Sequence, residues 1–224
     1  MRIVAILGSP HGIKGNTGQL LAEVVRGAQE AGAMATILSL AGREVGPCLA
    51  CDACHRSGQC AQRDSFRQFK DAMTGADGIV LASPNYIVSV SAQMKALMDR
   101  SCGLLHIQGL EGKYAAAVET SGGMGGDDVQ QYMLRFLRAA GCWTVGSLGA
   151  MGWQLAQEPT RAKALAAAAD LGGRLVECIK KKETFPDQAP ERAKFAGMMK
   201  QLVASQKDTW TYEYEYWKSR GQAS

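Results

Sequence analysis

The sequence predicts an α/β protein in which a parallel β-sheet is covered by helices on both faces. Five short apolar runs alternate along the chain with segments whose apolar residues recur at helical spacing. The chain has 224 residues, of which 46% are hydrophobic, so it can bury a sizeable core. Length alone suggests one domain, with or without an appendage.

The first half of the chain supplies three of the expected strands. Residues 2–7, "RIVAIL", form an apolar run that enters a Gly-Ser-Pro turn, as a buried strand does when it reaches a loop. A helix is expected from Thr17 to Gly32, because its apolar residues recur every three or four positions and Asn16 or Thr17 can cap it. Further strands are expected at residues 35–40 and 78–83, and helices near 65–75 and at 91–101.

The second half repeats this alternation and then changes character. Strands are expected at residues 113–120 and 143–150, and helices at 129–139 and about 159–181. We therefore predict a domain over residues 1–182 and a helical extension over 183–224, which ends in the aromatic tail "WTYEYEYW" at 210–217. This tail is expected either to fold back on its own chain or to form a contact between subunits, where Tyr and Trp are enriched.

Composition and charge argue against two classes of partner. The net charge is only +4 and no broad basic face is evident, so we expect no nucleic acid. No apolar run approaches the roughly 20 residues that span a bilayer, and the N-terminus lacks the features of a secretory signal. We expect a cytoplasmic protein that does not bind membranes. Disulfides are uncommon in that compartment, so clustered cysteines there indicate metal or redox chemistry.

The loop "GSPHGIKGNT", residues 8–17, joins the first strand to the first helix. Ligands of open α/β sheets bind beyond the carboxyl ends of the strands, and a helix N-terminus favours an anion. Ser9, Asn16 and Thr17 can add side-chain donors. The loop is neither a P-loop, because Asn16 stands where that motif needs lysine, nor a dinucleotide fingerprint. We expect a phosphate monoester such as that of FMN; an ordinary turn with a helix cap is the alternative.

Two further loops are expected at the same edge of the sheet. In "SPNYIVSV", after the third strand, Pro84 and Tyr86 make a rigid turn that carries an aromatic ring. In "TSGGMGG", residues 120–126, the glycines allow a ligand to approach the backbone closely. Plain loop flexibility is the alternative explanation of these glycines, but three suitable loops at one edge favour a ligand site.

Four of the seven cysteines lie in "PCLACDACHRSGQC", residues 47–60. The spacing Cys48-x2-Cys51-x2-Cys54-x5-Cys60 differs from zinc sites, which usually pair two short knuckles across a longer gap. Cysteines at x2 intervals match the cluster loops of ferredoxins, and Cys60 is available to close the same cluster. We predict a 4Fe–4S cluster on these four thiols. Zinc, a redox pair of Cys51 and Cys54, free thiols and a regulatory disulfide remain alternatives.

The other cysteines and histidines are expected to be structural. Cys102, Cys142 and Cys178 lie in predicted helices or strands, where a buried free cysteine is ordinary. His55, inside the cysteine motif, is a candidate ligand, but four thiolates already complete a set. His106 follows two leucines and is expected to serve packing.

At this point the motifs resemble a known family. "GSPHGIKGNT", "PNY" followed by "AQMKALMDR", and "TSGG" resemble the flavodoxin-like NADPH-dependent FMN reductase superfamily, and the cysteine motif resembles the iron–sulfur flavoproteins within it. The resemblance covers about residues 1–180. It implies a flavodoxin-like three-layer sandwich with a five-stranded parallel sheet in the order 2-1-3-4-5. It also implies homodimers or homotetramers in which the cluster of one subunit approaches the flavin of its neighbour.

The resemblance further implies which residues hold FMN. Ser9, Asn16 and Thr17 would contact the phosphate. His11 stands where relatives often have arginine, and because imidazole is usually neutral at pH 7, backbone N–H groups or Lys14 must meet the phosphate charge. The isoalloxazine ring would be bordered by Pro84, Asn85, Tyr86 and Ile87 on one side and by Ser121, Gly122 and Gly123 on the other.

The expected function is electron transfer through FMN and the cluster. In the first hypothesis the protein takes electrons from ferredoxin and reduces a small acceptor such as oxygen, peroxide or a quinone. In the second it is an NAD(P)H-dependent FMN or quinone reductase whose cysteines carry no cluster. A binding module that holds zinc in the cysteine loop is a third. We expect no catalytic side chain, because the cofactors themselves carry the chemistry.

Overall fold

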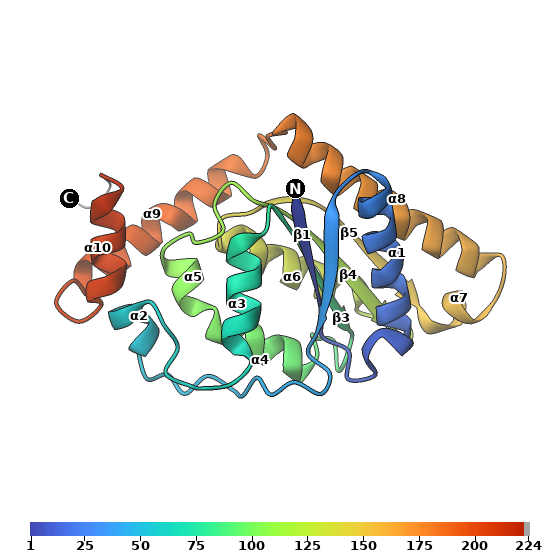
Figure 1. Ribbon diagram of the computed structural model, residues 1–224, viewed down its shortest axis with the longest axis horizontal. Helices are drawn as coiled ribbons and strands as arrows, with labels where there is room; N and C mark the ends of the chain where they lie inside the picture. The colour runs from blue at the N-terminus through green and yellow to red at the C-terminus, as the bar shows by residue number, and fades with distance from the viewer. Residues whose placement is uncertain (222–224) are drawn as a thin grey trace.

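The computed structural model describes residues 1–221 and contains one five-stranded parallel sheet (Figure 1). Its strands are β1 (Arg2–Leu7), β2 (Met34–Ser39), β3 (Gly78–Pro84), β4 (Tyr114–Ser121) and β5 (Trp143–Met151). The strand order is β2-β1-β3-β4-β5, which confirms the flavodoxin-like fold expected from the sequence.

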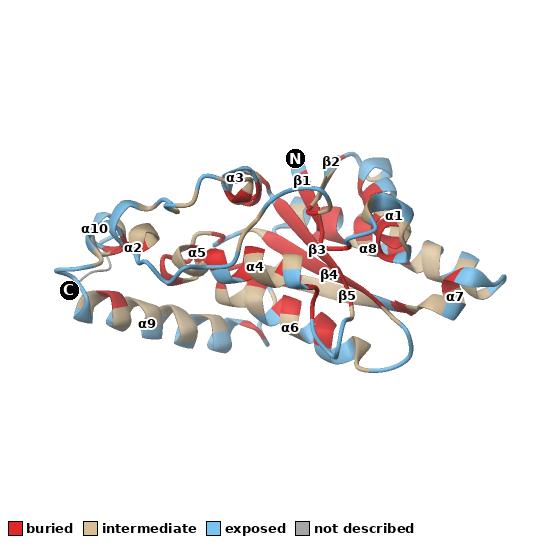
Figure 2. Ribbon diagram, turned by 90° about the horizontal axis from the view of Figure 1, so that it is seen from below, coloured by how far each residue is buried: buried red, intermediate tan, exposed pale blue. Residues whose placement is uncertain are grey.

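Helices cover both faces of the sheet (Figure 2). One face packs against α1 (Asn16–Glu30) and α8 (Thr160–Lys181), and the other against α3 (Phe66–Gly75), α4 (Ala92–Arg100) and α6 (Gly126–Ala139). Every residue of β3 is buried. Strands covered on both sides are apolar on both sides, which is why the run "GIVLAS" shows no alternation of apolar and polar residues.

Two glycines let α1 and α8 pack backbone against backbone. A Cβ atom on Gly27 would overlap the carbonyl of Ala169, and one on Gly172 would overlap the carbonyl of Val24. Any larger residue at either position would force the helices apart, because backbone atoms cannot move aside as a flexible side chain can. The contact fixes the position of α1, whose N-terminus carries the first predicted ligand loop.

The helix expected over residues 91–101 is α4, and a second, short helix that was not expected follows it. The Ser91 hydroxyl caps α4 by accepting a hydrogen bond from the backbone N–H of Met94 at 3.2 Å. The helix ends at Ser101, and α5 (Cys102–His106) begins directly after it. The break turns Cys102 toward the cysteine motif instead of along the axis of α4, as the pocket described below shows.

The C-terminal segment crosses the molecule and returns to the cysteine motif (Figure 1). It contains α9 (Ala189–Ser205) and α10 (Thr211–Ser219), and α10 packs against α2 (Ala53–Ser57) of the motif. Before α9, the Gln188 amide accepts from the backbone N–H of Thr144 at 3.0 Å and donates to its carbonyl at 2.8 Å. The tail therefore folds back on its own chain, which is one of the two arrangements expected for it.

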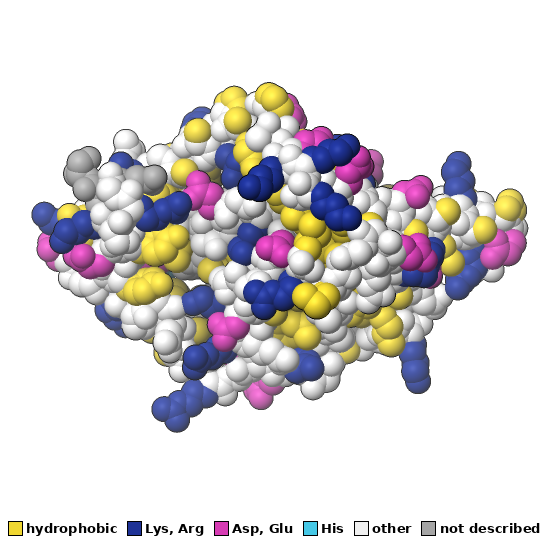
Figure 3. All heavy atoms as spheres, turned by 45° about the horizontal axis from the view of Figure 1, so that its top comes forward, with side chains coloured by type: hydrophobic (Ala, Val, Ile, Leu, Met, Phe, Trp, Pro, Cys, Tyr) yellow, Lys and Arg dark blue, Asp and Glu magenta, His cyan; other side chains and the backbone are white. Residues whose placement is uncertain are grey.

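The surface carries charges of both signs. On the face drawn in Figure 3, Lys and Arg side chains are interspersed with Asp and Glu. In the part of the chain that the structure describes, no helix is long and apolar enough to cross a membrane.

Candidate functional site

The loop between β1 and α1 is a compact turn at the carboxyl end of the sheet. Gly8 donates from its backbone N–H to the carbonyl of Ala82 at 2.7 Å, and a short 3₁₀ turn, Gly12–Lys14, follows. A Cβ atom on Gly15 would lie 2.9 Å from the Cβ of His11, closer than side chains approach one another. The loop can close this tightly only with glycine at that position.

The first turn of α1 is open toward an anion. Its N-cap is Gly15, and no side chain of the described residues caps the helix. The free N–H groups and the helix dipole therefore favour negative charge at this end. Ser9 is buried beside it and accepts from the N–H of His11 at 3.3 Å, while Asn16 and Thr17 form the first helical positions. The predicted phosphate residues thus surround one helix end, which fits a phosphate monoester.

The predicted second loop is a strained turn that exposes an apolar side chain. Tyr86 and Ser89 exchange backbone hydrogen bonds of 2.9 and 3.2 Å, so the chain reverses over Ile87 and Val88. These two residues have φ values of +52° and +55°, which β-branched side chains seldom adopt. Strain of this kind is concentrated at ligand-binding turns. The turn leaves Ile87 97% exposed at the rim of the site.

Thr120, which the sequence analysis did not single out, joins all three predicted loops. Its hydroxyl lies 2.5 Å from the hydroxyl of Thr17, and its carbonyl accepts from the N–H of Asn85 at 2.8 Å. Ser121 follows it directly, and a Cβ atom on Gly122 or Gly123 would meet no described atom within 4 Å. The predicted ring residues therefore gather at one edge of the sheet, next to open space over the glycines.

A buried carboxyl lies beneath the third loop. Glu119 is 1% exposed and lines a cavity of about 580 Å³ together with Ser121 and Asp127. Within the described residues its Oε1 has no hydrogen-bond partner. Burial and the charge of Asp127 raise the pKa of Glu119 to about 7, against a hydrogen bond from Ser121 that lowers it. Sequence analysis missed this residue because one glutamate at the end of an apolar run forms no motif.

All four cysteines of the motif line one pocket of about 250 Å³. The chain curves around it through three residues with left-handed backbone conformation, Ala50, Asp52 and Gly58. Cys102, expected to be structural, lines the same pocket from the start of α5. A pocket bordered by thiols from separate turns fits a group that is ligated by thiolates.

Arg100 brings positive charge to this pocket. Its buried guanidinium donates from Nη2 to the Sγ of Cys60 at 3.2 Å and pairs through Nη1 with Asp64. The hydrogen bond from Arg100 lowers the pKa of Asp64 to about 2, so the pair stays ionised. A cation beside a cysteine stabilises the thiolate that a metal needs. The pocket therefore fits the predicted cluster, and its thiolates are equally able to bind zinc.

A second group of polar side chains lies beside the pocket. The carboxylate of Glu213, on α10, is fully buried and accepts from Nδ1 of His55 at 2.6 Å and from Nδ1 of His106 at 2.9 Å. Trp210 stacks on both imidazoles, with ring centroids 4.5 and 5.0 Å away. Nε2 of His106 is 3.4 Å from Sγ of Cys102. Glu213 is 158 positions from His55, so no local sequence pattern reveals this group.

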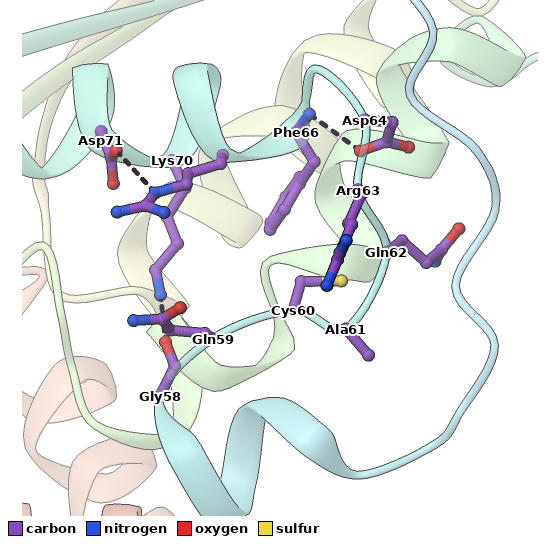
Figure 4. Close-up of a pocket in the computed structure, with 11 residues that line it drawn as sticks. Gly58, Gln59, Cys60, Ala61, Gln62, Arg63, Asp64, Phe66, Lys70 and Asp71 are labelled. Atoms are coloured by element: carbon purple, nitrogen blue, oxygen red, sulfur yellow. Dashed lines mark hydrogen bonds and ion pairs between the residues drawn. The ribbon is translucent and has the colours of Figure 1, made fainter.

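A cleft of about 570 Å³ lies along the segment that follows the cysteine motif (Figure 4). Arg63, Arg67 and Lys70 line it together with Cys60. Lys70 is held in place by donating from Nζ to a carbonyl of the motif, at 2.5 Å. Asp64 and Asp71 line it too, but they pair with Arg100 and Arg67, so Arg63 and Lys70 supply the excess positive charge of the cleft. Such a cleft next to a cluster loop is suited to an acidic redox partner.

Comparison with known proteins gives concordant results for sequence and fold. Residues 1–154 match the family described as NADPH-dependent FMN reductase. A protein named iron–sulfur flavoprotein from Archaeoglobus fulgidus is 29% identical over 222 residues, 99% of each chain. Another of that name, from Methanosarcina thermophila, is 32% identical over 167 residues, which covers 71% of this chain and 86% of the relative.

Solved structures share the fold. A flavodoxin, a WrbA-like protein from Agrobacterium tumefaciens, superposes with a TM-score of 0.56 at 18% identity. The match covers 81% of this chain and 99% of that one. At 18% identity, this similarity shows that the two proteins share the arrangement of their strands and helices.

Proposed function

The chain belongs to the NADPH-dependent FMN reductase family and, within it, to the iron–sulfur flavoproteins, and from this premise we propose that it carries electrons from a donor such as ferredoxin to a small acceptor through a 4Fe–4S cluster and FMN. A flavin-dependent redox role follows from the family. The single observation that supports the fuller proposal is that Cys48, Cys51, Cys54 and Cys60 line one pocket, next to the guanidinium of Arg100.

The residues of the chain would divide the work between the two cofactors. When bound, FMN exchanges electrons in pairs or singly and a 4Fe–4S cluster exchanges them singly, so together they interconvert the two kinds of transfer. The four cysteines of the motif would hold the cluster, and Arg100 offsets the charge of their thiolates. The open N-terminus of α1 would hold the phosphate, and Thr120 keeps the loops around the ring in register.

We propose that an acidic electron donor docks beside the cluster, in the cleft lined by Arg63, Arg67 and Lys70. Positive charge on the protein and negative charge on the donor accelerate encounter and orient the complex. The donor would then meet the chain beside the cysteine motif, and the acceptor, oxygen, peroxide or a quinone, would meet it at the flavin loops.

We also propose that the chain binds copies of itself and forms a homodimer or homotetramer. Ile87, Val88 and Met124 form an exposed apolar rim at the flavin loops, and Leu49 is exposed on the cysteine loop. Apolar surface of this kind is often covered in an assembly. Val88→Asp should lower the mass measured by light scattering, whereas Met198→Asp, on exposed α9 surface, should not. A wild-type protein of monomeric mass would refute the assembly.

The cluster is tested by metal analysis after anaerobic purification and reconstitution. Iron and sulfide should each approach about four per chain, and the visible spectrum should show a broad shoulder in addition to the flavin bands. Replacing any one of the four motif cysteines with alanine should disrupt the cluster and leave FMN bound, because the flavin loops lie on other segments. Cys178→Ala, a buried thiol in α8, is the matched control. A wild type with no iron and one tightly held zinc in the motif would disprove the cluster.

The alternative function is an NAD(P)H-dependent FMN or quinone reductase without a cluster, and the description of the matching family favours it. The two functions differ in their electron source. Rapid mixing under anaerobic conditions should show the flavin reduced by reduced ferredoxin much faster than by NADPH. Fast reduction by NADPH in a protein that lacks iron would establish the alternative instead.

A further inference from the structure

Three side chains that can ligate a metal converge beside the cysteine pocket, and none of them is one of the four motif cysteines. One ligand atom each from Cys102, His55 and His106 lies within 4.8 Å of the other two. The two imidazoles are stacked, with centroids 4.8 Å apart and planes inclined by 17°. Both turn Nδ1 toward the same carboxylate, so their Nε2 edges face away from it, and Nε2 of His106 meets Sγ of Cys102 at 3.4 Å. We propose that these three residues bind one zinc ion.

The buried carboxylate of Glu213 prepares the two histidines for this role. A carboxylate can only accept hydrogen bonds, so each Nδ1 that bonds to it carries a proton, and Nε2 is the nitrogen of each ring that is left to ligate a metal. Histidines that ligate metals usually donate their other N–H to a carboxylate in this manner, which fixes tautomer and ring orientation. Here one carboxylate serves two ligands, with 2.6 and 2.9 Å contacts.

The surroundings hold the ligands rigidly. Trp210 covers both imidazoles, and the indole N–H of Trp217 donates to the carbonyl of His106 at 3.1 Å. Glu213 and Trp217 are buried, with α10 packed on α2 and α9 and with Trp217 bonded to α5. Such a shell preserves the ligand geometry and excludes water from all but one side, since Cys102 borders the pocket of about 250 Å³.

Charge and ligand chemistry identify the ion. A thiolate on Cys102 and the carboxylate of Glu213 carry two negative charges between them, and a divalent cation with two neutral imidazoles balances them. Buried charge is stable only when it is compensated, and a divalent cation meets that need without a proton on either Nε2. Magnesium and calcium require oxygen ligands, whereas two imidazole nitrogens and one thiolate are typical of zinc.

The site is tested on protein whose cluster has been reconstituted anaerobically, so that the four motif thiols are occupied. After incubation with zinc chloride and removal of the excess, metal analysis should find one zinc per chain in the wild type and in Cys178→Ala. Cys102→Ala and His106→Gln should lose the zinc and keep iron and FMN. Glu213→Gln should keep the ligands and weaken zinc binding about 10- to 100-fold, because it removes the partner of both imidazoles.

X-ray absorption at the zinc edge gives a readout that does not depend on variants or on the flavin. The wild type should show one sulfur at about 2.3 Å and nitrogen or oxygen at about 2.0–2.1 Å. A shell of four sulfurs would place zinc in the cysteine motif and refute the site. If the wild-type protein retains no zinc, Cys102, Glu213 and the two histidines form only a network of ion pairs, and the proposal is refuted. Loss of iron in Cys102→Ala would assign this thiol to the cluster, which also refutes the proposal.

Discussion

Asn16, the first residue of α1, is an uncharged side chain at the end of the helix that we propose binds the phosphate. We expect Asn16→Asp to weaken FMN binding about tenfold or more, equivalent to about 1.4 kcal/mol, because it places a carboxylate beside the phosphate. The same carboxylate interacts favourably with the helix dipole, so the stability of the flavin-free protein should not fall. Quenching of flavin fluorescence during titration measures the affinity.

A matched variant separates local from general effects of that charge. Gln201→Glu adds the same charge on exposed α9 surface and should leave the affinity unchanged. Equal FMN affinity in Asn16→Asp and the wild type would mean that the phosphate is bound elsewhere.

The buried carboxyl of Glu119 should make the free energy of unfolding decrease as pH rises. Its pKa is raised from the ordinary 4.5 to about 7, so between these values the native state binds a proton that the unfolded state has lost. The free energy of unfolding therefore falls as pH rises through this window. Glu119→Gln should flatten that fall and make the protein more stable than the wild type above pH 7. Chemical denaturation at several pH values, with FMN saturating, measures the effect.

The control for this prediction is Glu44→Gln, at an exposed position. It should keep the wild-type slope of stability against pH. Identical slopes in Glu119→Gln and the wild type would show that the buried carboxyl ionises normally.

Sequence and structure differ most at residues whose role depends on distant partners. Ser9 and Asn16 follow the end of β1 and Pro84 is the last residue of β3, so their meeting at one edge follows from the predicted sheet. Glu119 and Glu213 have no such local sign. What distinguishes them is burial and a contact across the fold, and neither is encoded in neighbouring residues.

At the scale of elements, α10 is the helix on which the cysteine region depends. Trp217 is 4% exposed and its indole N–H is bonded, so Trp217→Ala removes a large buried ring and a hydrogen bond. We expect a loss of about 3–5 kcal/mol in the free energy of unfolding. Trp153→Ala, at an exposed tryptophan, should cost far less. Denaturant titration of both variants makes the comparison, and equal losses would contradict the assigned packing.

The boundary between α4 and α5 was predicted only in part. The expected end of the helix at residue 101 agrees with the end of α4, but the short helix α5 directly after it was not expected. The hydroxyl of Ser101 bonds back to the carbonyl of Leu97 at 2.8 Å, an interaction that competes with the regular helix. The consequence is functional, because α5 then carries both Cys102 and His106.

At the scale of the whole molecule, the charge of the cleft should govern encounter with an acidic donor. Arg67→Glu should slow reduction by ferredoxin about tenfold at low salt and reduce the dependence of the rate on ionic strength. Lys194→Glu, on exposed α9 surface, makes the same change in net charge and should have little effect. Stopped-flow rates over a range of salt concentrations test this, and equal rates for the two variants would exclude docking at the cleft.

The sheet was predictable as a whole because its signals are local and repeated. Five buried strands alternate with helices, and right-handed crossovers leave few ways to connect them in parallel. The path of the C-terminal segment could not be predicted from local signals. It is decided by side chains such as Trp217 and Glu213, whose partners His55 and His106 lie more than 100 positions away in the sequence.

Gln188 has a consequence for self-association that concerns β5 as an edge strand. Its amide supplies the donor and the acceptor that a neighbouring peptide unit would supply, and both main-chain groups of Thr144 are thereby occupied. Exposed edges are where proteins aggregate by adding strands from other molecules. At Thr144 a foreign strand would first have to displace a side chain of the same polypeptide, so one glutamine gives this margin of the sheet its own protection against intermolecular β-pairing.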